Sequence, residues 1–167
     1  ALADGPLVGS ALQEATGLDA FPLWKASVTA PGLLMRRVGR RYLRFDRTVE
    51  GLARMSPSIL REFLTYTVVG LANDKPAVEE AQARLAARIR VISRTKLRTA
   101  TRVVDESIGS LVRAGTLDPE SFCALVGGDI VYGMAHDVAR RESSTGVLVE
   151  GSDLDVIVLV ADEHAET

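Results

Sequence analysis

The chain has 167 residues, of which 47% are hydrophobic and 25% charged, a composition that is typical of globular proteins and excludes a disordered chain. Its formal net charge of -2 excludes an attraction of the whole molecule to nucleic acid or to a membrane, so a local patch must bind any such partner. The only cysteine, Cys123, excludes an internal disulfide, and no apolar run approaches the roughly 18 residues of a membrane span. We therefore expect a cytoplasmic protein that makes no membrane contact.

The first segment, residues 1–32, is rich in glycine, proline and alanine. Its apolar residues follow no long period, which predicts a loosely structured N-terminal arm with one short helix near Ser10–Thr16. Pro31-Gly32 then separates this arm from the rest of the chain.

Residues 33–116 form the predicted helical region. Apolar residues recur there at steps of three or four, which predicts a first helix over residues 33–54. Ser56-Pro57 is a favourable helix start, and the broad apolar face behind it predicts a second helix that continues to Leu71. The longest apolar stripe predicts a third helix over residues 77–113.

Arginines cluster in this helical region. One group, Arg36–Arg47, lies on the first predicted helix, and a second group lies on the third predicted helix between Arg84 and Arg102. Because guanidinium groups bind phosphates, nucleic acid is a candidate partner for the Arg36–Arg47 group. The alternative is a solvated helix face, or arginines that pair with acidic residues of a partner subunit.

The last segment, residues 117–167, contains short apolar runs in place of the long apolar stripes of the helical region. The apolar run Phe122–Val126 is compatible with a helical turn or with a buried strand, and Asp129–Arg141 is predicted to be a helix. Val156–Val160 is apolar on both faces and rich in β-branched residues, which predicts a fully buried strand. Such a strand must be covered on both sides, so we expect self-association or a partner chain.

A pair of aspartates, Asp153 and Asp155, stands at the entry of that predicted strand. Side chains two residues apart on a strand point to the same face, so both carboxylates are expected to project together. Two neighbouring carboxylates repel unless a cation lies between them. Mg²⁺ prefers oxygen ligands and usually combines one or two carboxylates with phosphate oxygens, so Mg²⁺ is the expected cofactor.

In this setting residues 122–160 resemble the nucleotidyltransferase superfamily, the group that shares a palm-like core with polymerase β. Its members combine an apolar strand, a glycine turn that opens a helix, and a strand headed by Asp-x-Asp. The resemblance implies an α+β fold in which a mainly helical N-terminal region precedes the start of a nucleotidyltransferase-like α/β core with a buried C-terminal strand. It also implies that Asp153 and Asp155 are catalytic and bind Mg²⁺, and that a nucleoside triphosphate contacts Gly128, Asp129, Gly133 and Ser152.

Three features depart from the superfamily's pattern, and one of them is the long interval from Gly133 to Asp153. Asp129 stands where the family has a phosphate-binding serine, and a carboxylate repels a triphosphate. The family's third carboxylate lies on a later strand, and the stretch from Ala161 to Thr167 is too short for a strand that returns beside the first. Three explanations stay open: the chain continues, the missing ligand comes from elsewhere, or the site is inactive.

A purely structural interpretation of the same residues is the alternative. In it, Gly127-Gly128 is a helix-breaking turn, and Asp129 caps the following helix. The aspartate pair then belongs to a polar strand entry, or to a hairpin of Val147–Val149 with Val156–Val160. By the same reasoning His136 and His164 are expected to be ordinary surface histidines, and Cys123 a buried and inert thiol.

Two functions are therefore expected. The first is a nucleotidyltransferase-type enzyme, active or inactive, that transfers a nucleotidyl group to an unknown acceptor. The second is a non-catalytic helical assembly or interaction protein with a basic arginine face, whose C-terminal strand adds to another sheet.

Overall fold

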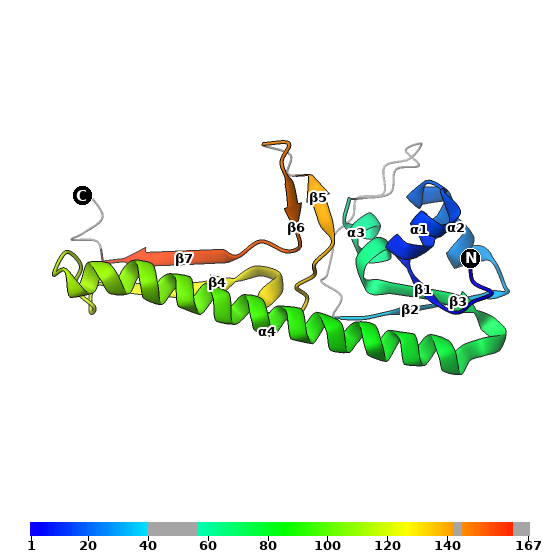
Figure 1. Cartoon of the computed structure of the whole chain (residues 1–167), viewed down its shortest axis with the longest axis horizontal. Coiled ribbons are helices and arrows are strands. Elements are labelled where there is room, and N and C mark those ends of the chain that lie inside the picture. Colours follow the sequence, from blue (N-terminus) through cyan, green and yellow to red (C-terminus); the bar gives the residue numbers. More distant parts are fainter. Residues whose placement is uncertain (40–56, 142–144, 162–167) are drawn as a thin grey trace. The chain divides into compact units, whose positions relative to one another are not determined.

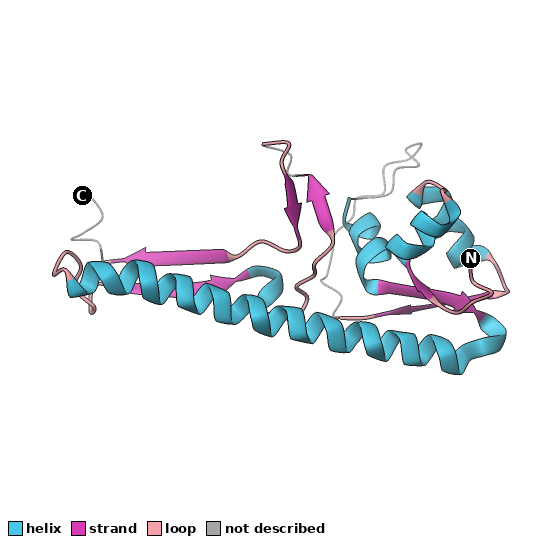
Figure 2. Ribbon diagram, in the orientation of Figure 1, coloured by secondary structure: helices cyan, strands magenta, loops and turns pink. Residues whose placement is uncertain are grey.

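The structure is a computed structural model that describes residues 1–39, 57–141 and 145–161. The chain divides into two compact units, Ala1–Arg88 and Ile89–Thr167, with the boundary inside a long helix. This division differs from the three parts expected from the sequence, which had boundaries at residues 32 and 116. Both helices and strands are present (Figure 2), so the fold is α+β.

The first unit contains a three-stranded antiparallel sheet in the order β1-β3-β2 (Figure 1). Its strands are β1 Leu7–Val8, β2 Leu33–Arg37 and β3 Thr67–Leu71. Its helices are α1 Gly9–Thr16, α2 Ala20–Thr29 and α3 Pro57–Tyr66. The 3-10 helix η1, Ala72–Asp74, leads into the long helix α4, Lys75–Arg113, whose first part belongs to this unit.

The central strand β3 is buried on both faces. Val69 packs against Leu12 of α1 and Phe63 of α3. Val68 belongs to a separate cluster with Val78 of α4. Because successive strand residues point to opposite faces, the helices α1 to α3 cover one face of the sheet and the start of α4 covers the other (Figure 1).

Several predictions for this unit need correction. Residues 1–32 are not a loose arm, because they form β1, α1 and α2; the short helix near Ser10–Thr16 is confirmed as α1. Residues 33–37 are a strand and not the start of a helix, and the remainder of that predicted helix, residues 40–54, lies outside the described residues. The second predicted helix ends at Tyr66, and residues 67–71 are a strand.

The reason for the last two corrections is long-range pairing. Leu33–Arg37 and Thr67–Leu71 pair with each other residue by residue, from Leu33 opposite Leu71 to Arg37 opposite Thr67. Both segments contain apolar residues at helical spacing, but the hydrogen bonds of a sheet and burial on two faces outweigh that weak local preference. The third predicted helix, 77–113, is confirmed as α4.

The second unit combines the rest of α4 with two antiparallel strand pairs. Strand β4 pairs with β7, and β5 pairs with β6. The elements are β4 Phe122–Gly127, the 3-10 helix η2 Gly128–Ile130, β5 Ala139–Arg141, β6 Leu148–Glu150 and β7 Asp155–Val160. The apolar run Phe122–Val126 is thus a strand.

Three predictions for this unit are wrong. The helix over Asp129–Arg141 is absent: η2 is followed by turns and by β5, and glycines with positive φ at 128 and 133 interrupt the backbone. The strand Val156–Val160 exists but is exposed along its whole length, with Ile157 and Leu159 each 53% exposed. The alternative hairpin with Val147–Val149 does not form, because β6 pairs with β5.

Within the three described ranges, no helix is long and apolar enough to cross a membrane.

Candidate functional site

The pairing of β4 with β7 brings the glycine turn beside the second aspartate of the pair. Gly127, the last residue of β4, lies opposite Asp155, the first residue of β7. Gly128 follows with φ of 71°, a conformation that favours glycine. A Cβ built on Gly128 would collide with the Asp155 carboxylate. The turn therefore needs glycine for its backbone conformation, and a side chain at this position would displace the exposed Asp155 carboxylate.

Ser152 connects the segment before β7 with the segment after β4. Its side chain is buried, with the residue only 7% exposed. Its Oγ accepts a hydrogen bond from the His136 backbone N–H at 3.1 Å and donates to Asp129 Oδ2 at 3.4 Å. Its own backbone N–H donates to the His136 carbonyl at 3.0 Å. Ser152 therefore holds Asp129, His136 and the entry to β7 together.

The backbone at Gly151 supports the same contact. Gly151 has φ of 78°, and a Cβ there would collide with the His136 carbonyl oxygen. Its backbone N–H donates to the Val138 carbonyl at 3.2 Å. The close approach of the two backbones thus depends on the absence of a side chain at position 151.

Helix α4 fixes both segments from one of its faces. Lys96 Nζ donates a hydrogen bond to the Ser152 carbonyl oxygen at 2.6 Å. One turn earlier, the buried Ser93 Oγ accepts from the Ala135 backbone N–H at 3.1 Å and donates to the Ile89 carbonyl at 2.8 Å. Because residues three apart lie on the same helix face, Ser93 and Lys96 act as two neighbouring anchors.

The structure brings together four of the six predicted site residues: Gly128, Asp129, Ser152 and Asp155. Asp153 is exposed and precedes β7, which begins at Asp155, so strand alternation does not set the direction of its side chain. Gly133 lies in the turn after η2 with φ of 67°, and a Cβ there would meet no atom within 4 Å. Its role in the described structure is that of a turn residue.

Sequence reasoning missed Ser93, Lys96 and His136. His136 is 6% exposed and not a surface residue, and its Nδ1 accepts from the Val138 backbone N–H at 3.2 Å. His164 lies outside the described residues. The one available signal was the position of Ser93 and Lys96 on the buried stripe of α4 that includes Ile89 and Ala100. Cys123 is exposed, which corrects the expectation of a buried thiol.

Asp153 and Asp155 are the carboxylates that the sequence predicted to hold a cation at this place. In the described part of the chain no group of three or more His, Cys, Asp or Glu side chains could hold a metal ion. A Mg²⁺ ion held by two carboxylates would need further oxygen ligands, such as phosphate oxygens, to complete its coordination.

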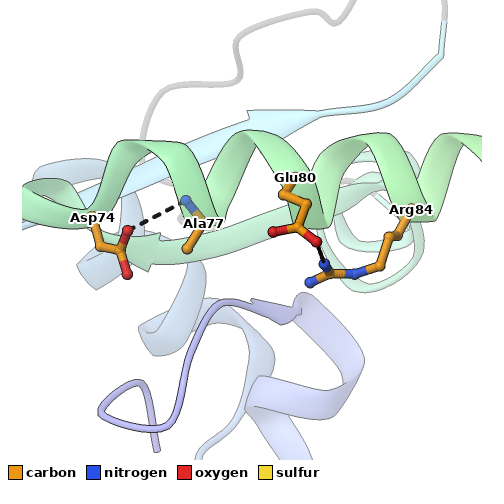
Figure 3. A network of polar contacts seen from close by, with 4 residues as sticks. All are labelled: Asp74, Ala77, Glu80 and Arg84. Atoms are coloured by element: carbon orange, nitrogen blue, oxygen red, sulfur yellow. Dashed lines mark hydrogen bonds and ion pairs between the residues drawn. The ribbon is translucent and has the colours of Figure 1, made fainter.

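The arginine groups of the sequence have two different environments. On α4, exposed arginines pair with acidic residues one turn away: Arg84 with Glu80 at 2.5 Å (Figure 3) and Arg102 with Glu106 at 3.5 Å. These pairs match the expectation of a solvated helix face. Figure 3 also shows the start of α4, where Asp74 Oδ1 accepts from the Ala77 backbone N–H at 3.3 Å.

The group Arg36–Arg47 was predicted to lie on a helix, but its first two arginines lie in strand β2. Arg36 and Arg37 are the last residues of β2. Arg37 forms an ion pair with Glu62 of α3 at 2.5 Å, and its carbonyl accepts from Gln82 at 2.7 Å. The four later arginines of the group are outside the described residues.

No family model, no curated protein and no solved structure matches the chain. The residues of the second unit and their contacts are thus the basis on which a function is assigned. The combination of a glycine turn, an adjacent carboxylate and a lysine-anchored entry loop is the most specific arrangement among them.

Proposed function

We propose that the second unit is a nucleotidyltransferase-type site that binds a magnesium–nucleoside triphosphate and transfers a nucleotidyl group to an acceptor. The observation that carries this proposal is the pairing of β4 with β7, which sets the Gly128 turn against the Asp155 carboxylate. The parts of the superfamily's pattern that also support it are the strand before the glycine turn and the strand headed by Asp-x-Asp, whereas the helix that the superfamily has after the glycine turn is absent. Magnesium nucleotides are abundant in the cytoplasm, which is where we propose that the protein acts.

The proposal gives each residue a role. Asp153 and Asp155 hold Mg²⁺, which supplies positive charge against the phosphates when it is bound. Gly128 leaves space beside Asp155 that any side chain would fill. Lys96 and Ser152 position the loop that contains Asp153 and leads into Asp155, Lys96 through the Ser152 carbonyl and Ser152 through His136.

Asp129, which replaces the family's serine, has a structural role in this proposal. Its carboxylate accepts the hydrogen bond from Ser152 Oγ at 3.4 Å. A carboxylate engaged in this way is directed toward the Ser152 hydroxyl, so it stabilises the loop and is not required to contact a phosphate. In this proposal, therefore, Asp129 stabilises the loop through Ser152, whereas the family's serine at this position binds phosphate.

The reaction class is substitution at phosphorus. An acceptor hydroxyl oxygen attacks the α-phosphorus, the bond from that phosphorus to the bridging oxygen breaks, and pyrophosphate and a proton are released. This chain's own part is to hold the nucleotide and to keep the two aspartates at the mouth of β7. Most of the catalytic effect in such a site comes from positioning and from charge complementarity.

The test is calorimetry of the full chain with ATP in the presence of Mg²⁺. We expect binding that requires the metal, and we expect Asp155→Asn and Asp153→Asn to abolish it while the circular dichroism spectrum stays unchanged. Asp105→Asn is the matched control, because Asp105 is an exposed aspartate of α4 in the same unit. Absence of heat at millimolar nucleotide, or equal binding by all three variants, would overturn the proposal.

One observation favours a second candidate function, that of an assembly or interaction protein. Strand β7 is apolar from Val156 to Val160 and exposed throughout, and Leu125 on β4 is exposed as well. Exposed apolar strands of this kind add to other sheets. Analytical ultracentrifugation tests this candidate: Ile157→Lys should weaken self-association, and a wild-type monomer at high concentration would exclude association of the chain with itself.

A further inference from the structure

We propose that two copies of the chain pair through β7, antiparallel and about a two-fold axis at Val158, to form one four-stranded sheet. Within the described ranges β4 and β7 form a sheet of two strands, so one edge of β7 has no strand beside it (Figure 1). This inference rests on the second candidate function and deepens it, because it names the partner, the strand and the register. It does not depend on the nucleotide site.

The free edge of β7 lacks the features that usually prevent strand addition. Natural edge strands are protected by charged side chains, by proline or by a bulge. The run Val156–Val160 contains no charge, proline or glycine, and its register with β4 continues without a bulge. Every residue of β7 is exposed. The strand can therefore offer its unpaired backbone N–H and C=O groups to another strand.

The sequence of β7 selects a second copy of the same strand as the occupant. An interface with two-fold symmetry is self-complementary, because one surface patch must fit itself. The five apolar residues of β7 read nearly the same in both directions, Val-Ile-Val-Leu-Val. In antiparallel pairing about the central valine, the residues opposite one another are Val156 and Val160, Ile157 and Leu159, and Val158 and its own copy. Every cross-strand pair is thus apolar, and such pairs are what stabilises adjacent strands.

Charge determines the direction of the pairing. In the antiparallel register, Asp155 lies opposite the uncharged Ala161 of the second copy. In a parallel pair with the strands in register, Asp155 would lie beside its own copy, and like charges at that distance destabilise a sheet. The antiparallel register separates the two Asp155 residues by six positions, roughly 20 Å. Each nucleotide site therefore stays at its own end of the joined sheet.

Strand β7 fits this role better than β4, whose outer edge also has no strand beside it within the described ranges. The residues of β4 alternate between half-buried and exposed, whereas all those of β7 are exposed. The centre of β4 contains Ala124, a small residue that is depleted in strands, whereas β-branched residues predominate in β7. The self-complementary edge is therefore that of β7.

The size of the contact predicts a reversible dimer. Standard stable interfaces bury about 800 Å² on each partner, and smaller ones are typical of transient complexes. The proposed contact joins one strand of six residues from each copy, about 20 Å long, with its half-exposed side chains. We therefore expect dimers that dissociate on dilution.

The experiment is disulfide trapping in the full chain with Cys123→Ser, which removes the native exposed thiol. Val158→Cys should give a covalent dimer on a non-reducing gel after mild oxidation, because opposite Cα atoms about 4.5–5.5 Å apart suit a disulfide. Val156→Cys alone should not, because its two thiols would be four positions, about 14 Å, apart. Val156→Cys combined with Val160→Cys should restore trapping, because these residues lie opposite one another.

The matched control is Val131→Cys in the same background, because Val131 is 55% exposed in the same unit but outside β7. It should remain monomeric. Equal trapping of the variants at positions 131, 156 and 158 would mean random collision and would overturn the pairing. Trapping of Ala124→Cys in place of Val158→Cys would overturn the assignment to β7.

Sedimentation of the unmodified chain completes the test. A dimer that dissociates on dilution and is lost in Val158→Lys, which sets two like charges opposite each other, supports the pairing. Self-association that Ile157→Lys weakens, without trapping at Val158, would keep the second candidate function and overturn this register. A monomer at every concentration would overturn both. Asp155→Asn should dimerise at least as well as the wild type, so a loss of ATP binding leaves this result unchanged.

Discussion

Lys96 and Ser152 are 56 residues apart in sequence, yet Lys96 Nζ donates a hydrogen bond to the Ser152 carbonyl oxygen at 2.6 Å. Lys96 is half-buried on α4, and Ser152 is buried in the loop that leads to β7. A charged donor on a helix thus holds the loop that contains Asp153 and leads into Asp155, the first residue of β7. The contact makes the position of Asp153 and Asp155 depend on α4.

Removal of this contact should loosen the loop. Lys96→Met keeps the length of the side chain and removes the charged donor, so the free energy of unfolding should fall by about 1.5–3 kcal/mol. Affinity for magnesium–ATP should fall roughly tenfold, which corresponds to about 1.4 kcal/mol. Urea unfolding and calorimetry measure the two effects. Lys25→Met, on an exposed helix face in the other unit, is the control, and equal values for both variants would show that the Lys96 contact has no effect.

A matched pair of glycines tests the closeness of Asp155 to the turn. Gly128 and Gly133 both have positive φ, so alanine at either position should cost about 1–2 kcal/mol of stability through backbone strain. The Asp155 carboxylate blocks a Cβ at Gly128 only, because a Cβ at Gly133 meets nothing within 4 Å. Gly128→Ala should therefore displace the carboxylate and weaken metal-dependent ATP binding, whereas Gly133→Ala should not. Equal ATP affinities in calorimetry would contradict this relationship.

The Ser152 hydroxyl should be required for the stability of the second unit. Ser152→Ala leaves the His136 backbone N–H without its hydroxyl acceptor in a buried place, which costs about 1–3 kcal/mol. Thermal unfolding followed by circular dichroism measures this loss. Ser110→Ala is the control, because the exposed Ser110 hydroxyl only donates to the Ser107 carbonyl. A Ser152 variant as stable as the Ser110 variant would exclude the clamp described for this residue.

The core of the first unit should depend on Phe63. This side chain is 1% exposed and packs with Leu12 and Val69 at the centre of the unit. Phe63→Ala should lower the free energy of unfolding by about 3–5 kcal/mol, because it removes buried apolar area and leaves a cavity. The exposed Phe21 provides the comparison, and Phe21→Ala should cost much less. Chemical denaturation of both variants distinguishes them, and similar losses would mean that Phe63 is not a core residue.

Local patterns in the sequence determined some elements of this protein directly. The stripe of apolar residues between positions 77 and 113 predicted α4, and the β-branched run after Asp155 predicted β7. Both predictions hold because neighbouring residues alone set the relevant preferences: side chains at steps of three and four share a helix face, and β-branched residues favour extended backbone. The aspartate pair and the glycine turn were identified on similar local grounds.

Tertiary pairing decided the rest. Residues 33–37 and 67–71 have apolar spacing that suits a helix, but they pair with each other across the chain as β2 and β3. Residues 129–141 do not form the predicted helix, because hydrogen bonds that span 42 and 16 residues connect this segment to Ser93 of α4 and to Ser152. The anchoring of Ser152 by Lys96 was likewise invisible in the sequence. Contacts between residues so far apart depend on how separate elements pack, and a local pattern carries no information about that packing.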